Sequence, residues 1–572
     1  MHVLLLASAF NSLTQRTHTA LRERGHWVAV HIAEGPDSAQ GMREAVRAAD
    51  PDLILAPMLT VPVPDDIWQD RRVLIVHPGP PGDRGPSSLD WALHESAQTW
   101  GVTVLQADKD MDAGDIWAHA SFEVGACGKS ELYRGAAADA ALEAILLAVA
   151  RFARGDYEPV PLDYGDPAVQ GRLRPYHGQA FRAVDWTADD TATVLRKLRT
   201  ADSQPGVLDE LFGQEYYLHG GHAEERLSGA PGEIVATRDG AVCRATTDGA
   251  VWIPQLRRRR TPGGPATWKL PATTVLGDKV AGVPEFPLPD DGEGWSEIRY
   301  EENGRVGRVT FAFPGGAMST DQCRRLLAAY QEARTRPTDV LLLGPRTDFF
   351  SNGIHLGVIE AATDPAAEAW ANINAMDDLA EAVLTTTDRL TVATLPGNAA
   401  AGGLMLALAA DEVWCREASV LNPHYRLMGL HGSEYWTYSL PRRVGAQEAA
   451  RLTEEALPVG AAEARRIGLV DHAVPGTVAQ FDAWVERGAA QLAGSPLHAE
   501  RLRAKRARRE ADEADRPLAS YREDELRHMK RNFYEPGEPH PALRSAFVRR
   551  AKGTGTPEHI AGWLPPLTQP TD

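Results

Sequence analysis

The chain has 572 residues, of which 43% are hydrophobic and 24% are charged. A single hydrophobic core stops growing at about 250 to 300 residues, so this length predicts about three or four domains. The composition is that of a globular protein and not of a disordered one. The 60 basic and 78 acidic residues give a formal net charge of −18, which repels phosphate backbones and argues against nucleic acid as a partner.

The cysteine spacing and the apolar segments argue against a metal site, secretion and membrane insertion. The four cysteines are far apart and have no paired metal-binding spacing, so no metal site is expected. The N-terminal apolar run is too short for a signal peptide, and no stretch approaches the roughly 20 apolar residues that span a bilayer. We therefore expect a cytoplasmic protein with no membrane partner.

Residues 1–160 alternate short apolar runs with helical stretches. This pattern predicts a doubly wound α/β domain, with strands at Val3–Leu6, Trp27–Ile32, Leu53–Ala56 and Val73–Val76. Ligands of such sheets bind beyond the carboxyl ends of the strands.

The periodicity changes over residues 161–275. A helix at Asp189–Arg199 precedes several short strands, which is typical of a small β-barrel-like domain. The strands are expected at Glu215–Leu218, Gly232–Thr237, Ala241–Thr246 and Val251–Pro254.

Three further segments complete the expected order. Residues 276–295 contain GVPEFPLPDDGEG, which favours an exposed linker. Strands and alanine-rich helices alternate over residues 296–490 and predict another α/β domain, and charged helical segments fill a C-terminal extension at 491–572.

Candidate catalytic side chains occur first in the N-terminal domain. His77 ends the strand VLIVH and enters the loop HPGPPGDRGPSSLDWAL, and Asp112 and Asp115 flank a glycine turn further on. His77 could donate a hydrogen bond or proton to the oxyanion formed by attack on a formamide, with Asp112 orienting it. Taken singly, such residues are more often solvated or structural.

These strings resemble the 10-formyl-tetrahydrofolate-dependent transferases over about residues 1–260. The matching features are the His-Pro strand end, the Arg-Gly loop and the Asp-x-Gly-Asp turn. The resemblance implies that 10-formyl-tetrahydrofolate is the donor and that His77 and Asp112 are catalytic. It also implies three cofactor-binding residues: Arg84, Gly85 and Asp115.

One position departs from the family pattern. The catalytic asparagine of the family aligns with Ile75, which has no polar group to offer the formyl oxygen. The segment FNSLTQR offers two replacements, Gln15 and Asn11, for which turn or capping roles are equally open. Gln15 is the candidate catalytic residue of the two.

In the C-terminal half, two strands end at glycine-containing turns, within RTDFFSNGIHLG and LPGNAAAGGLMLALAAD. Gly402 and Gly403 open an apolar helix whose free N–H groups point outward, and the N–H of Ile354 follows Gly353. Two such donors suit the oxygen of a thioester. The alternative is close packing of small residues.

Here the sequence resembles the crotonase, or enoyl-CoA hydratase, family over about residues 299–490. The matching motifs are Phe-x-x-Gly-x-x-Leu and Gly-x-Ala-x-x-Gly-Gly. The resemblance implies a crotonase fold, coenzyme A as a ligand, and an oxyanion hole formed by Ile354 and Gly402. The two glutamates of the hydratases align with Met405 and Tyr425, so ordinary hydration is not expected.

The polar side chains that remain nearby are Tyr425, Glu434 and Tyr435. Glu434 is the candidate acid or base, assisted by Tyr425. The alternatives are a glutamate at a helix start capped by Ser433, and a core role for Tyr435.

The order of the two halves, with FNSLTQR, HPGPPGDRGPSSLDWA and SEYW in place, resembles the HypX or HoxX hydrogenase maturation family. This resemblance implies synthesis of the carbon monoxide ligand of nickel-iron hydrogenases, by formyl transfer to coenzyme A and decarbonylation of formyl-CoA. The hydrogenase large-subunit precursor or other maturation proteins would be partners. The alternatives are an amine formyltransferase fused to an independent acyl-CoA enzyme, and a non-catalytic scaffold.

Overall fold

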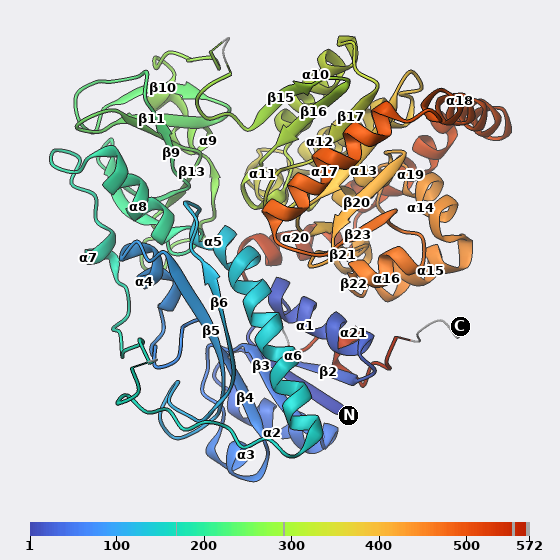
Figure 1. Ribbon diagram of the computed structural model, residues 1–572. Coiled ribbons are helices and arrows are strands. Elements are labelled where there is room, and N and C mark those ends of the chain that lie inside the picture. The colour runs from blue at the N-terminus through green and yellow to red at the C-terminus, as the bar shows by residue number, and fades with distance from the viewer. Residues whose placement is uncertain (168, 290–291, 552–554, 568–572) are drawn as a thin grey trace. The chain divides into compact units, whose positions relative to one another are not determined.

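The computed structural model describes residues 1–167, 169–289, 292–551 and 555–567 (Figure 1). Contacts along the chain divide it into two units, Met1–Trp295 with Lys552–Asp572, and Ser296–Ala551. Each unit has hydrophobic cores of its own. No helix among the described residues is long and apolar enough to cross a membrane.

The first unit begins with a six-stranded sheet in the order β2-β1-β3-β4-β5-β6. The first four of these strands are parallel, and β5 and β6 are antiparallel additions. The helices α1 and α6 contact each other, whereas α2 packs on the face that carries Leu4 and Leu6. The predicted doubly wound α/β architecture is confirmed. Its elements are β1 (His2–Ala7), α1 (Ser12–Glu23), β2 (Trp27–Ile32), α2 (Ser38–Ala49), β3 (Leu53–Met58), β4 (Val73–His77), α4 (Ser88–His94), β5 (Thr99–Gln106), β6 (Ile116–Glu123) and α6 (Ala138–Arg154).

Two four-stranded sheets follow, in the orders β10-β11-β12-β9 and β14-β13-β8-β7. Buried apolar residues of both sheets and of α8 form one core, and a second core lies around Trp252, in agreement with the predicted small β-barrel-like domain. Each of the four predicted strands overlaps an observed one, and the predicted helix is α8. The elements are α8 (Thr191–Ala201), β7 (Val207–Leu211), β8 (Gln214–His219), β9 (His222–Glu224), β10 (Ile234–Arg238), β11 (Ala241–Ala245), β12 (Ala250–Ile253), β13 (Gln255–Arg258) and β14 (Leu270–Pro271).

The expected linker at 276–295 contains a segment that binds this domain. The N–H of Thr237 donates to the carbonyl of Pro284 at 2.9 Å, and the N–H of Phe286 donates back to Thr237 at 2.9 Å. Phe286 and Trp295 pack against the core around Trp252. Residues 290 and 291 lie outside the described residues, and the domain limits 1–160, 161–275, 276–295, 296–490 and 491–572 stay predictions.

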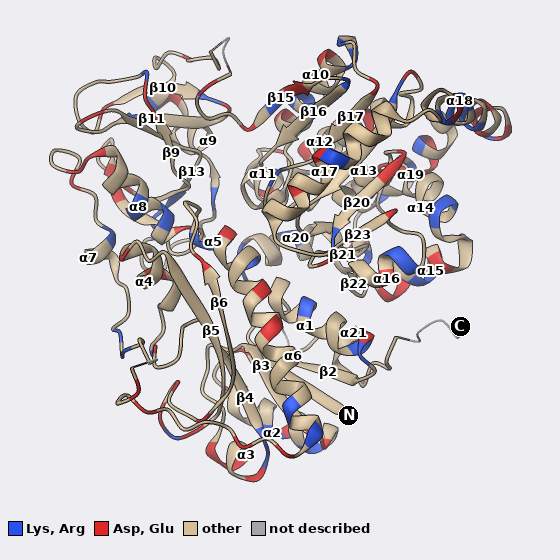
Figure 2. Cartoon of the chain, viewed as in Figure 1, with Lys and Arg blue, Asp and Glu red and all other residues tan. Residues whose placement is uncertain are grey.

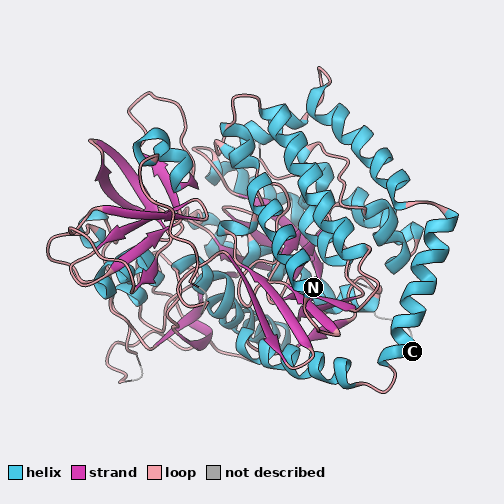
Figure 3. Ribbon diagram, turned by 90° about the horizontal axis from the view of Figure 1, so that it is seen from above, coloured by secondary structure: helices cyan, strands magenta, loops and turns pink. Residues whose placement is uncertain are grey.

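The second unit contains a six-stranded sheet, β15-β16-β17-β18-β20-β23, and a small sheet, β19-β21-β22. The strands β15, β22 and β23 are Ile298–Asn303, Val459–Gly460 and His472–Val474. Helices predominate in this unit, whereas strands and loops predominate over residues 202–271 (Figure 3). The predicted crotonase-type α/β fold is confirmed. The elements used below are β16 (Val306–Phe311), α10 (Thr320–Thr335), β17 (Val340–Leu343), α12 (Pro365–Leu384), β18 (Leu390–Leu395), β19 (Ala399–Ala400), α13 (Gly402–Leu408), β20 (Glu412–Arg416), β21 (Val420–Asn422), η4 (Tyr425–Met428) and α14 (Trp436–Val444).

Helices also fill most of the predicted C-terminal extension: α18 (His498–Asp515), α19 (Leu518–Tyr534) and α20 (His540–Val548). The helix α19 packs on α12 and α14, so the extension helps to enclose the crotonase core. The helix α18 carries both signs of charge, with basic residues over 501–509 and acidic residues over 510–515 (Figure 2). Its Lys505 is buried, and the ammonium group lies 2.6 Å from Asp411.

Residues 555–567 return to the first unit and cover the edge strand β2. Val28 and Leu564 exchange both backbone hydrogen bonds, at 3.1 and 2.9 Å, and the N–H of Ile32 donates to the hydroxyl of Thr556. Ile560 of this segment is fully buried. An uncovered edge strand would expose unpaired N–H and C=O groups to other chains, and this segment prevents that.

Truncation after Ala551 should therefore loosen β2. Loss of the Ile560 contact and the strand pairing should lower the free energy of unfolding of the first unit by about 2–4 kcal/mol. Hydrogen exchange at the amides of Val28 and Ile32 measures this directly. A chain that ends at Leu567 keeps the pairing and is the control; equal exchange in both chains would contradict the assignment.

Candidate functional site

His77 lies at the carboxyl end of β4 and is held between two carboxylates. Its Nε2 is 3.0 Å from Oδ2 of Asp83, and its Nδ1 is 3.4 Å from Oδ2 of Asp112. The imidazole is 5% exposed, so both contacts are largely removed from water. The predicted convergence of a histidine and an aspartate is present, and Asp83 adds a second carboxylate.

Asp83 is the centre of a buried network. Its Oδ2 also accepts a hydrogen bond from the hydroxyl of Ser88 at 2.6 Å, and its Oδ1 lies 2.9 Å from Nε of Arg174. Arg174 continues to Glu95 through a second ion pair. Gly79 gives this network its space, because a Cβ there would lie 2.4 Å from Oδ2 of Asp83.

The residues predicted to bind the folate lie on the Asp112 side. The N–H of Gly85 donates to Oδ2 of Asp112 at 3.2 Å, and Nε of Arg84 donates to the carbonyl of Met111 at 2.8 Å. Asp115 contributes its carbonyl oxygen, which accepts from the N–H of Gln106 at 2.9 Å. The structure thus brings His77, Asp112 and the Arg84–Gly85 loop together.

Asn11 and Gln15, the candidate residues after the first strand, form hydrogen bonds with residues close to them in the chain. Asn11 caps α1 by accepting from the N–H of Thr14 at 3.0 Å, which is the capping role left open for it. Gln15 lies within α1 and donates to the carbonyl of Phe10 at 2.8 Å, so its role at the formyl group stays a prediction. Ile75 is half-buried and packs against the core of the sheet.

Sequence reasoning did not single out Asp83 or Arg174. The sequence could have suggested Asp83, because it lies six positions after His77 in the same glycine- and proline-rich loop. Arg174 carried no such signal, since 91 positions separate it from Asp83.

In the second unit, the two predicted donor segments lie against each other. The N–H of Ala400 donates to the carbonyl of Ser351 at 2.8 Å, and a Cβ on Gly353 would be 3.1 Å from the nitrogen of Gly402. Within the described part of the chain, neither the N–H of Ile354 nor that of Gly402 donates to a backbone carbonyl. These two N–H groups are therefore the candidate donors of an oxyanion hole.

Gly403 has the close-packing role that was the alternative interpretation of this glycine-containing segment. A Cβ at this position would lie 2.2 Å from the carbonyl oxygen of Ser351, so only glycine permits this approach of α13 to the neighbouring segment.

Glu434 lies next to Gly402. Its Oε2 accepts from the hydroxyl of Tyr425 at 2.6 Å and from the N–H of Ser433 at 3.1 Å. Its Oε1 lies on the other side, only 2.1 Å from where a Cβ on Gly402 would be. Burial raises the pKa of Glu434 to about 7, although the hydrogen bond from Tyr425 lowers it.

Glu434 is not the helix-start glutamate of the alternative interpretation. The helix α14 begins at Trp436 with no side-chain cap, and the hydroxyl of Ser433 donates instead to Asp377 at 2.9 Å. Tyr435 is fully buried, as its core alternative required.

The positions of the two hydratase glutamates carry no carboxylate. Met405 is fully buried in the core of α13. Burial raises the pKa of Tyr425, and the neighbouring charge of Glu434 adds to this, so Tyr425 acts as a hydrogen-bond donor and not as an anion. A water molecule positioned by two carboxylates is therefore not available here.

Two further buried carboxylates, Asp377 of α12 and Glu525 of α19, bind the turn that contains Glu434 and Tyr435. Neither was predicted from the sequence. Their sequence signal was a charged residue within an apolar helical stripe. Glu525 lies on the stripe formed by Leu518, Tyr521, Met529 and Phe533.

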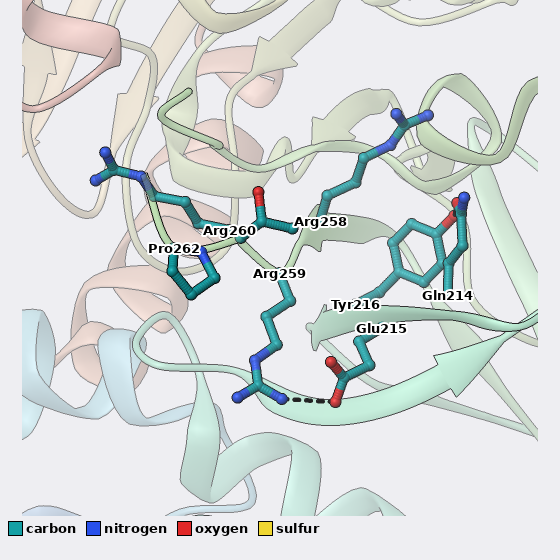
Figure 4. A pocket seen from close by; sticks show the side chains of 8 residues that line it. Gln214, Glu215, Tyr216, Arg258, Arg259, Arg260 and Pro262 are labelled. Atoms are coloured by element: carbon teal, nitrogen blue, oxygen red, sulfur yellow. Dashed lines mark hydrogen bonds and ion pairs between the residues drawn. The ribbon is translucent and has the colours of Figure 1, made fainter. Parts of the chain in front are cut away.

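An open pocket of about 560 Å³ in the β domain is lined by Arg258, Arg259 and Arg260. Their guanidinium groups point in three different directions (Figure 4) and bind Val275, Glu215 and Gly264 respectively. They do not converge on a common anion. In the described residues, no group of three His, Cys, Asp or Glu side chains could hold a metal ion.

Comparisons with known proteins define the class. The formyl transferase model matches residues 35–149, the formyl transferase C-terminal domain matches 178–266, and the enoyl-CoA hydratase/isomerase model matches 301–535. Methionyl-tRNA formyltransferase of Variovorax paradoxus is 26% identical over 40% of this chain and 70% of its own length. The chain is thus a fusion of a formyltransferase and a crotonase-type domain.

Two relatives match over almost the full length. The hydrogenase maturation factor HoxX of Bradyrhizobium diazoefficiens is 49% identical over 98% of this chain and 97% of its own. HypX from Aquifex aeolicus, solved in complex with tetrahydrofolic acid, is 42% identical with a TM-score of 0.92 and 98% of each chain covered. The chain belongs to the HypX/HoxX family of hydrogenase maturation factors.

Replacing Asp83 by Asn should impair catalysis at His77 without unfolding the chain. The amide keeps the volume but offers a donor to Nε2, so the ring loses its orientation and tautomer, and formyl transfer should fall by about 100-fold or more. Nitrogen-15 chemical shifts of the His77 ring report the tautomer. Asp163→Asn is the control; normal transfer and unchanged shifts in Asp83→Asn would show that Asp83 is dispensable.

Proposed function

We propose that the chain makes carbon monoxide from 10-formyl-tetrahydrofolate, by formyl transfer to coenzyme A and decarbonylation of formyl-CoA. The observation that carries the proposal is Glu434, whose Oε1 lies next to Gly402 while the hydratase carboxylates are missing. The tetrahydrofolate complex of the Aquifex relative supports the donor, and the enoyl-CoA hydratase match supports the acceptor.

The first step is acyl transfer. The thiol of coenzyme A attacks the formyl carbon, its proton passes to the leaving nitrogen of tetrahydrofolate, and the C–N bond breaks as the C–S bond forms. Asp83 holds the ring of His77 at Nε2, and Nδ1, whose contact with Asp112 is the longer one at 3.4 Å, is the group that donates to the developing oxyanion while Asp112 helps to manage the proton. The proposed folate-binding residues are Arg84, Gly85 and Asp115. Gln15 supplies the hydrogen-bond donor to the formyl oxygen that Ile75 cannot provide.

The second step removes the formyl hydrogen. The N–H groups of Ile354 and Gly402 bind the thioester oxygen, and Oε1 of Glu434 takes the proton from the formyl carbon. The C–H electron pair stays on carbon, the C–S pair leaves with sulfur, and carbon monoxide and a thiolate result. The proton then passes from Glu434 to the thiolate, so the step needs no external acid.

Exclusion of water favours this outcome over hydrolysis. A carboxylate-activated water would convert formyl-CoA to formate, and Met405 and Tyr425 cannot activate one. The carbon monoxide would serve as a ligand of the nickel-iron centre. This makes the hydrogenase large-subunit precursor or another maturation protein the recipient.

The direct test supplies 10-formyl-tetrahydrofolate labelled at the formyl carbon, with and without coenzyme A, and traps the released gas with haemoglobin. Labelled carbon monoxide should form only with coenzyme A. Labelled formyl-amine with no gas would favour the amine formyltransferase, and tight folate binding with no turnover would favour the scaffold.

Single substitutions should separate the two steps. Glu434→Gln removes the base and should lower gas release by about 100-fold or more while formyl-CoA accumulates, whereas His77→Ala should abolish both products. Mass spectrometry of the coenzyme A pool distinguishes the cases. Glu523→Gln and His119→Ala, both at exposed positions, are the controls. Full gas release by Glu434→Gln would refute its role.

A further inference from the structure

The segment Ser433–Tyr435 presents Glu434 in an unusual backbone conformation. Glu434 and Tyr435 have φ angles of 61° and 60°, in the left-handed region that residues with a Cβ seldom adopt. Two consecutive residues of this kind persist only where surrounding contacts fix them. The contacts that fix this turn come from two buried carboxylates on separate helices.

Glu525 of α19 binds the C-terminal side of the turn. Its Oε2 accepts from the N–H of Tyr435 at 2.9 Å, and its Oε1 accepts from the N–H of Thr437 at 2.8 Å and from the Thr437 hydroxyl. These bonds satisfy N–H groups at the start of α14 that have no partner within the helix.

Asp377 of α12 binds the other side. Its Oδ1 accepts from the N–H of Glu434 at 2.8 Å, and its Oδ2 accepts from the hydroxyl of Ser433 at 2.9 Å. The Ser433 hydroxyl also lies 3.3 Å from Glu525, so it links the two carboxylates. Asp377 and Glu525 are both fully buried.

Gly432 completes the arrangement from the η4 side. A Cβ at this position would lie 2.4 Å from the ring of Tyr425, so glycine lets this ring pack close and place its hydroxyl on Glu434. One oxygen of Glu434 is thus held by Tyr425 and Ser433, and the other is directed to Gly402.

The carboxylate cluster, meaning Asp377, Glu434 and Glu525, has little compensating charge. Arg522 of α19 has Nε 3.8 Å from Asp377, but it also pairs with two further carboxylates of α12, Asp378 and Glu381. Three carboxylates in a dry site cannot all ionise at neutral pH without more cations.

The pKa directions agree with this charge balance. Burial raises the pKa of Asp377 well above its ordinary value, and the charges of Glu434 and Glu525 add to this. Burial raises the pKa of Glu525 to about 7, against the hydrogen bonds from Thr437, Tyr435 and Ser433 that lower it. The other titratable groups that face Glu434 are Tyr425 of η4 and Cys323 of α10, and burial raises the pKa of each.

We propose that Asp377 and Glu525 are positioning residues for Glu434, which hold its turn left-handed and its Oε1 toward Gly402 and which share a proton with it. The inference rests on the proposed decarbonylation. Its consequence is that the proton affinity of the base depends on two side chains that do not reach the formyl carbon.

The test measures gas release from supplied formyl-CoA as a function of pH. Glu434 must be ionised to act as a base, so the rate of the wild-type protein should rise with pH, with a midpoint that reflects its pKa of about 7. Glu525→Gln removes a negative charge that raises this pKa, so its midpoint should move to lower pH. Its plateau rate should fall by about tenfold or more, because the turn loses acceptors.

Two gentler variants keep the test informative if Glu525→Gln does not fold. Asp377→Asn weakens the acceptor of the Glu434 N–H and the Ser433 hydroxyl and should lower the plateau rate, whereas Ser433→Ala removes only the linking hydroxyl and should lower the plateau rate less. Glu523→Gln, an exposed carboxylate two positions from Glu525, should change neither the midpoint nor the plateau rate. Folded Glu525→Gln and Asp377→Asn with wild-type midpoints and plateaus would overturn the proposal.

A second readout separates this inference from the proposed function. The infrared band of protonated carboxyl groups can be titrated in the wild-type protein and in each variant without any substrate. A band that titrates near neutral pH and is altered in Glu525→Gln supports proton sharing even if formyl-CoA yields no gas. No such band in the wild-type protein refutes the proton sharing whatever the activity.

Discussion

A carboxylate removed from water loses several kcal/mol of solvation, and it is tolerated only when it is paired, hydrogen-bonded or protonated. Both candidate sites are organised by this constraint, but they meet it in different ways. In the first unit, Asp83 has a guanidinium at 2.9 Å in addition to Ser88 and His77. In the second unit, Arg522 is shared among three carboxylates of α12. Protonation must therefore neutralise part of the negative charge there, whereas Arg174 neutralises it at the first site. A paired carboxylate suits a site that holds a histidine in one orientation, and a proton-sharing cluster suits a site that must accept and return a proton.

Close backbone approaches give both sites their geometry. Gly79 leaves room for the contact between His77 and Asp83, and Gly402 leaves room for Oε1 of Glu434. In each case a methyl group would occupy the position of a catalytic oxygen or its partner, so the glycine is required by space and not by an unusual φ angle. The two candidate sites therefore share one feature: a glycine leaves space for an oxygen of a buried carboxylate, Asp83 in the first unit and Glu434 in the second.

The sequence predicted the architecture and the outline of both sites, because those features depend on local order along the chain. The strand that ends at His77 and the strands that lead to the Gly353 and Gly402 turns are visible as apolar runs followed by glycine or proline. The left-handed turn at Glu434 was not predicted, because Asp377 and Glu525 fix it from separate helices. The supporting residues were missed for the same reason. Arg174 reaches Asp83 only through the folded chain, and Glu525 reaches the turn across 90 positions from Tyr435. Their roles depend on which helices pack together, and a single helix pattern does not specify its partner. A charge within an apolar stripe, as at Glu525, was the one signal available.

The chemistry proposed for the second unit places a specific demand on its base. Decarbonylation takes a proton from carbon and returns one to sulfur, so the same group must act first as a base and then as an acid. A carboxyl with an ordinary pKa would be a weak base for the first task, and a group with a much higher pKa would hold its proton and be inactive near neutral pH. Burial raises the pKa of Glu434 to about 7, which places it between these limits. The hydratase arrangement, with two carboxylates and a water molecule, could also transfer protons. Its water molecule, however, would hydrolyse formyl-CoA. Met405 and Tyr425 in place of those carboxylates remove the pair that positions the hydratase water, and Glu434, on a turn fixed by Asp377 and Glu525, keeps proton transfer.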